Sequence, residues 1–202
     1  MRGRIGHAQV DTLQAALDGS LRNWLEKTSN ARPKSVRDIG ARESLRGMTW
    51  RHLPDPARAI AVAASDAVVA AREHNRDRFG VAVETLAGTE GSGLVLGAVV
   101  RLLLEELHPD GLDSDDIRQV IENCLRAAAA WQPSVDPHTV LVLLTGALGI
   151  HDQDEQAPPP TPASLARHTA LLVADLLTAT PRPLAWYLTA TFAEIERTEL
   201  HD

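Results

Sequence analysis

Four dipeptides in this chain place a helix-capping side chain directly before a proline, and they limit the fold more than any other feature. They are Asp55-Pro56, Asp136-Pro137, Thr161-Pro162 and Thr180-Pro181, each followed by an apolar run with helical spacing. Asp or Thr at an N-cap accepts a hydrogen bond from an unpaired backbone N–H, and proline suits the first helical position because it has no N–H to leave unpaired. No stretch longer than a few residues alternates as a strand does. The pattern therefore predicts an all-α fold.

The spacing of these signals predicts a single globular domain of seven to nine helices. We expect helices over residues 8–27, 34–46, 56–76, 92–107, 114–130, 137–149, 162–179 and 182–199, with a further short helix at 79–87. The runs 94–107 and 139–148 are apolar on nearly every side, and a helix of that kind is normally buried. We therefore expect these two helices at the centre, with Leu103 and Leu143 in the core.

Charge divides the chain into a basic N-terminal helical segment, residues 1–53, and an acidic helical core domain, residues 54–202. Residues 1–52 hold ten Arg or Lys against five Asp or Glu, whereas the rest of the chain holds ten Arg against 22 acids. A basic segment attached to an acidic body can bind a polyanion or an acidic protein surface. It can also dock on its own body or face water.

The basic segment carries the residue types that most often dominate protein interfaces, which are arginine and tryptophan. Our leading interpretation is a non-catalytic, regulatory interaction protein whose basic segment contacts a protein partner or a second copy of the chain. Trp24 and Trp50 are candidate anchors. The residues expected to bind the partner are Arg37, Arg42, Arg46, Trp50 and Arg51.

Part of the same segment gives a second interpretation. Ser35-Val-Arg-Asp-Ile39 and Trp50-Arg-His-Leu53 resemble the helix-turn-helix of tetracycline-repressor-type regulators. The connection Gly40–Thr49 is one residue shorter than in that family and lacks its small-Gly-hydrophobic-Ser turn. The resemblance implies a DNA-binding regulator with a C-terminal dimerisation or ligand domain, in which Arg46, Thr49, Trp50, Arg51 and His52 face DNA. A helical hairpin with solvated arginines remains the alternative.

Several short motifs suggest chemistry but lack the residues that the chemistry needs. The turn Gly88–Gly93 has neither the Lys-Ser/Thr of a P-loop nor a preceding strand, so we expect Ser92 to be a helix N-cap. Glu105 and His108 have the Glu-x-x-His spacing of di-iron helices without a second copy. The acids of 110–116 do not follow the order of a calcium loop, so we expect Asp113 or Ser114 to cap the next helix.

The remaining candidates are equally incomplete. His151, Asp152, Asp154 and Glu155 lie in a proline-rich acidic stretch that we interpret as an exposed loop. Cys124 is the one cysteine, so no disulfide forms within the chain, and its apolar stripe predicts a core thiol. His168 and Asp175 share a helical face, which alone indicates no catalytic site. We expect no catalytic, cofactor or metal site.

Hydropathy gives no sign of a membrane segment. The longest apolar run, residues 139–150, has 12 residues, whereas a span needs about 20. No signal peptide is visible near Met1. We therefore expect a cytoplasmic protein that does not enter a membrane.

Overall fold

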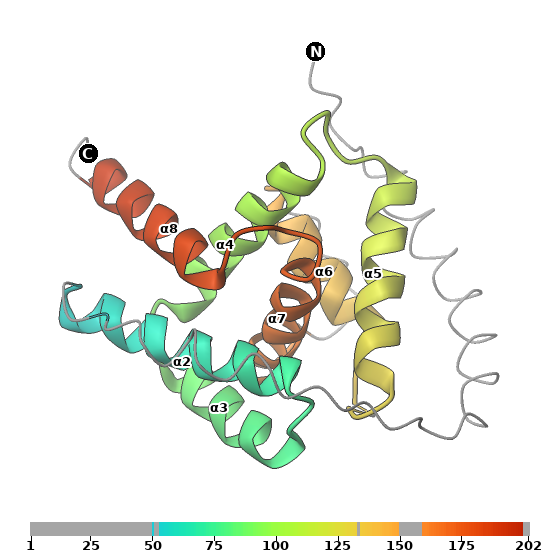
Figure 1. The fold of residues 1–202 in the computed structure, drawn as a ribbon, viewed down its shortest axis with the longest axis horizontal. Helices are drawn as coiled ribbons and strands as arrows, with labels where there is room; N and C mark the ends of the chain where they lie inside the picture. The colour runs from blue at the N-terminus through green and yellow to red at the C-terminus, as the bar shows by residue number, and fades with distance from the viewer. Residues whose placement is uncertain (1–49, 51–52, 133, 150–158, 200–202) are drawn as a thin grey trace.

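A computed structural model describes residues 50, 53–132, 134–149 and 159–199. These residues form seven helices and no strand (Figure 1). The all-α prediction is therefore confirmed for this part of the chain. The predicted helices over 8–27 and 34–46 lie outside it. The helices are α2 (Asp55–Arg72), α3 (Arg76–Gly88), α4 (Ser92–Leu107), α5 (Ser114–Ala129), α6 (Pro137–Ala147), α7 (Pro162–Leu176) and α8 (Leu184–Glu199).

Two of the four cap-proline pairs begin helices as predicted. The Asp136 carboxylate accepts from the backbone N–H groups of His138 and Thr139 at the start of α6, and the Thr161 hydroxyl accepts from Ser164 N at the start of α7. In both helices proline occupies the first turn, where its missing N–H leaves nothing unpaired.

The other two pairs were wrong in detail. Helix α2 begins one residue earlier than expected, so that Pro54 is its N-cap and Asp55 lies inside the first turn. Helix α8 begins at Leu184, and Thr180-Pro181 belongs to the turn before it. Pro183 follows in the same turn, and the residue before a proline is pushed away from helical geometry.

The centre of the fold is α7. It contacts α2, α3, α4, α5 and α6, and Figure 1 shows it enclosed by them. The sequence predicted one apolar stripe on this helix, yet every residue from His168 to Ala174 is buried. The reason is the size of its side chains: Ala170, Ala174 and Thr169 let neighbouring helices approach on sides that a stripe of large residues would not mark.

Of the two helices expected at the centre, α4 contacts α2, α3, α6, α7 and α8, whereas α6 contacts α4, α5 and α7. Leu103 in α4 is fully buried, as predicted, but Leu94 on the same helix is 72% exposed. Leu143 in α6 is partly buried and packs against the core from outside, so its predicted core position was wrong. Uniform hydrophobicity therefore marked α4 correctly as a core helix, whereas Leu143 of α6 borders the core.

Candidate interaction surface

The surface that follows the basic segment directly is the pair α2 and α3, which pack antiparallel. Helix α2 turns buried alanines toward the body, among them Ala64, Ala67 and Ala71. The helix reverses at His74, whose φ of 52° is left-handed, and Asn75 then caps α3 by accepting from Arg78 N. The alanines let α2 pack closely on the body, and the Asn75 cap stabilises the start of α3 after the turn. Together they hold the two helices as a hairpin.

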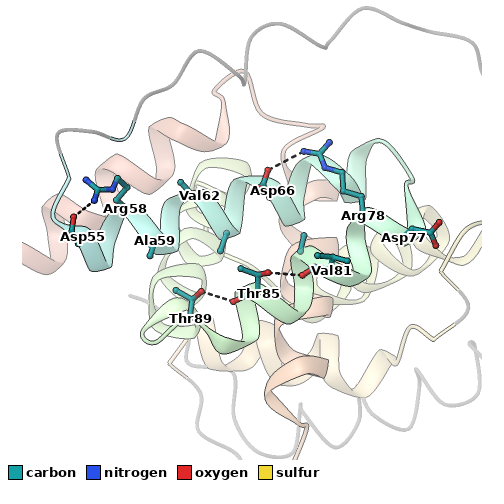
Figure 2. Close-up of a pocket in the computed structure, with 12 residues that line it drawn as sticks. Asp55, Arg58, Ala59, Val62, Asp66, Asp77, Arg78, Val81, Thr85 and Thr89 are labelled. Carbon is teal, nitrogen blue, oxygen red and sulfur yellow. Dashed lines mark hydrogen bonds and ion pairs between the residues drawn. The ribbon is translucent and has the colours of Figure 1, made fainter.

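The outward side of this hairpin is a groove with an aliphatic floor, shown in Figure 2. It opens between α2 and α3 with a volume of about 900 Å³. The buried Ala63 and Ala82 form its floor, and the exposed Ala59 lines it as well. Val62 and Val81 stand beside it with 47% and 68% of their surfaces exposed. The alanine side chains are too short to fill the space between the helices, and the two valines make the lining of the groove apolar.

Threonine hydroxyls do not make this groove polar. Thr85 Oγ1 donates to the Val81 carbonyl at 3.0 Å, and Thr89 Oγ1 donates to the Thr85 carbonyl at 2.8 Å. Both hydroxyls are therefore bonded to the helix that carries them.

Charged side chains of both signs border the groove at its two ends. Asp55 and Arg58 form an ion pair at the α2 start, and Arg78 pairs with Asp66 at 3.3 Å at the other end, near Asp77 (Figure 2). All of these side chains are well exposed, so the pairs contribute little to stability and can exchange partners readily.

A second polar cluster lies in the N-terminal half of α7. His168 is 2% exposed; its Nε2 accepts from the Asp136 backbone N–H at 2.8 Å, and its Nδ1 is 2.7 Å from the Ser164 carbonyl. These partners require a neutral ring with the proton on Nδ1. Burial lowers the pKa of His168 below its ordinary 6.5. The ring fixes the start of α6 to α7 and leaves no nitrogen for chemistry.

A third cluster joins the end of α4 to α8. Tyr187 Oη donates to Glu106 Oε2 at 2.9 Å, and Arg182 Nη1 lies 3.3 Å from the same oxygen. The Arg182 guanidinium also stacks on the Trp186 ring at 3.9 Å. Burial, together with the neighbouring Glu106 carboxylate, raises the pKa of Tyr187. The phenol therefore stays protonated and acts as a structural donor.

The single thiol is not a nucleophile. Cys124 is free and fully buried on α5, and burial, followed by the charge of Asp175, strongly raises its pKa. A thiol must ionise to react, so this one is inert. The core assignment from sequence is confirmed.

The short motifs have structural explanations. The N-cap of α4 is Gly91, with a left-handed φ of 76°, whereas Ser92 is inside the helix and donates to the Leu86 carbonyl, so the Ser92 cap prediction was wrong. Glu105 pairs with Arg101. His108 ends α4 and lies 3.7 Å from Asp116.

Asp113 caps α5, and it is one of the two residues predicted for this position. Its carboxylate accepts from the N–H groups of Asp115 and Asp116, and the Asp116 side chain accepts in return from Asp113 N. The stretch 151–155 is outside the described residues. Within the described ranges, no three His, Cys, Asp or Glu side chains are grouped so as to hold a metal ion.

The structure places one of the five predicted partner-binding residues. Trp50 is 7% exposed and packs in the core just before α2, and Leu53 N donates to its carbonyl at 3.1 Å. The four predicted arginines, Arg37, Arg42, Arg46 and Arg51, lie outside the described residues. Sequence reasoning missed Val62 and Val81, because isolated valines on an alanine-rich helix pair do not reveal which face lacks a neighbour.

No single helix in the part of the chain that the structure describes is long and apolar enough to cross a membrane. Helices α3 and α4 meet the criterion of length and composition only when taken together, and they are bent by 110°. Comparisons with protein-family models, with curated proteins and with solved structures find no match for this chain.

Proposed function

We propose that this chain is a non-catalytic helical interaction protein with a regulatory role in the cytoplasm. Its contact region consists of the basic segment, residues 1–53, and the α2–α3 groove. The observation that carries the proposal is the groove itself, in which Val62 and Val81 remain exposed over an alanine floor. Exposed apolar surface bordered by charge is typical of protein interaction sites.

Proximity links the two parts of the contact region. The basic segment joins the body at Trp50, immediately before α2, and Asp55 at the start of α2 already lines the groove. Trp50, a described residue of the segment, and the charged rim of the groove therefore lie close together along the chain. Charged residues at the rim of an interface speed the association of the two proteins, whereas the apolar residues at its centre contribute most of the affinity.

The experiment compares binding of purified partner by three forms of the full chain. Candidates captured from the native host are identified, purified and titrated against the unmodified chain, the Val62→Glu/Val81→Glu variant and the Arg37→Ala/Arg42→Ala/Arg46→Ala/Arg51→Ala variant. We expect both variants to lose binding and to keep the helical circular dichroism of the unmodified chain. Unchanged binding by both would contradict the proposal.

The DNA-binding regulator remains the second proposal, supported by the basic charge of residues 1–52. Binding through several phosphate contacts weakens steeply as salt rises. We expect affinity for duplex DNA no tighter than the non-specific range of about 10⁻⁴–10⁻⁶ M at physiological salt. A sequence-selective complex in the nanomolar range, lost in the four-arginine variant, would instead establish the regulator.

A further inference from the structure

We infer that the α2–α3 groove docks on the same groove of a second copy of this chain, about a two-fold axis next to Val62. The inference rests on the proposed function, because it names the partner of the groove. It is carried by the order of charged and apolar residues along α2 and by the exposure of each of them.

Helix α2 presents a charge pattern that complements itself when reversed. Arg58, Val62 and Asp66 line the groove at successive intervals of four residues. At a rise of 1.5 Å per residue, each charge lies about 6 Å along the axis from Val62, on opposite sides. A two-fold axis at Val62 runs the two α2 helices antiparallel, so that Arg58 of each copy faces Asp66 of the other.

Helix α3 extends this complementarity to the ends of the groove. Arg78 and Asp77 lie at the Asp66 end, whereas Asp55 lies at the opposite end (Figure 2). The same two-fold axis brings Asp55 of one copy to Arg78 of the other. The side chains of Asp55, Arg58 and Arg78 are 86%, 42% and 43% exposed, so they can exchange their present partners for new ones across the axis.

The centre of the face supplies the apolar contact. Because the axis lies next to Val62, α2 of one copy packs antiparallel on α2 of the other at the roughly 8–10 Å at which helices pack, and α3 faces α3. Val62 then meets Val62 of the second copy, and Val81 is covered by the second copy's α3. An isologous contact of this kind buries the same patch twice. A basic helix of another protein fits less well, because the rim of the groove carries both positive and negative side chains. Their order is complementary to the same order read in the opposite direction.

The first test measures the molar mass of the full chain by light scattering after size exclusion. We expect twice the 21.8 kDa of one chain for the unmodified protein and one chain mass for Val62→Glu. The matched control is Leu94→Glu, because Leu94 is equally apolar and 72% exposed but lies on α4, outside the groove. The control should stay dimeric.

The second test exploits the predicted pairing across the axis. Arg58→Glu alone and Asp66→Arg alone each set like charges against each other, and we expect each to raise the dimer dissociation constant about tenfold or more. The double variant restores opposite charges, so it should regain the dimer. Within one copy, Arg58 and Asp66 are eight residues apart on α2, about 12 Å along its axis, and they pair with Asp55 and Arg78 respectively. Rescue therefore requires a second copy.

Three results would overturn this inference: a single-chain mass at every accessible concentration, a dimer that Val62→Glu leaves intact, or failure of the double variant to restore association. A single-chain mass together with loss of a purified partner by Val62→Glu would reject self-docking and retain the proposed function. If Val62→Glu changes neither the dimer nor the binding of a purified partner, both self-docking and the proposed function are rejected. Circular dichroism of each variant confirms that its fold is intact.

Discussion

The α4–α8 contact and the antiparallel α2–α3 pair differ in the side chains that they carry on their outer surfaces. Between α4 and α8, long polar side chains close the contact: Arg101 donates to both carboxylate oxygens of Glu194 at 2.8 Å, and Tyr187 bonds to Glu106. Between α2 and α3, the outer side holds alanines and two exposed valines, and its ion pairs lie only at the ends. The first contact is complete within one chain. The second leaves apolar surface that a further molecule can cover.

The largest expected change is in the free energy of unfolding, and it differs between the two ends of α4. Leu103→Ala should lower the free energy of unfolding by about 2–5 kcal/mol, because a fully buried leucine loses transfer energy and leaves a cavity. Leu94→Ala on the same helix should change it by no more than about 0.5 kcal/mol. Urea denaturation measures both. Similar losses at the two sites would show that α4 is not oriented as described.

A smaller effect tests the polar closure of the α4–α8 contact. Tyr187→Phe should cost about 1.5–3 kcal/mol, the range for a hydrogen bond to a charged group, because the phenol donates to the Glu106 carboxylate. The matched control is Val81→Phe, which changes an exposed groove residue and should leave the stability of the single chain nearly unchanged. A Tyr187→Phe variant as stable as the unmodified protein would show that packing alone holds α8.

The smallest effect depends on pH and concerns the inner side of the body. His168 has a pKa below 6.5 in the folded protein, so the unfolded chain binds more protons as pH falls from there. Its contribution is therefore present above about pH 6.5 and is lost as pH drops through the folded pKa. Denaturation at a series of pH values should show this decline.

The His168→Gln variant isolates that contribution from other groups. Burial raises the pKa of Asp136, but the hydrogen bonds that its carboxylate accepts from Thr139 and His138 outweigh burial and lower it. The contribution of Asp136 to the stability of the protein is therefore also lost in acid. Burial raises the pKa of Asp175, which acts in the opposite direction. Both remain in the variant, so the difference between the two proteins reports His168 together with its effect on the pKa of Asp136. Parallel pH curves would contradict the assigned ring contacts.

Local chemistry made much of this fold predictable, and packing made the rest unpredictable. Asp136, Thr161 and Asp113 cap helices because a capping side chain needs only its own next few residues. The central position of α7 depends on Ala and Thr side chains that admit neighbours from several sides, and no stripe reveals that. The groove was hidden for the same reason, since exposure of Val62 depends on which helices lie beside it.

The central claim is that the α2–α3 face meets its own copy at Val62, and site-directed cross-linking tests it most directly. A disulfide requires Cα atoms within about 7 Å. We expect full-length Val62→Cys to form covalent dimers rapidly under mild oxidation, whereas Leu94→Cys, exposed on another face, should not. Cys124 is fully buried and present in both variants, so it does not affect the comparison. Equal and slow cross-linking of the two variants would contradict the claim.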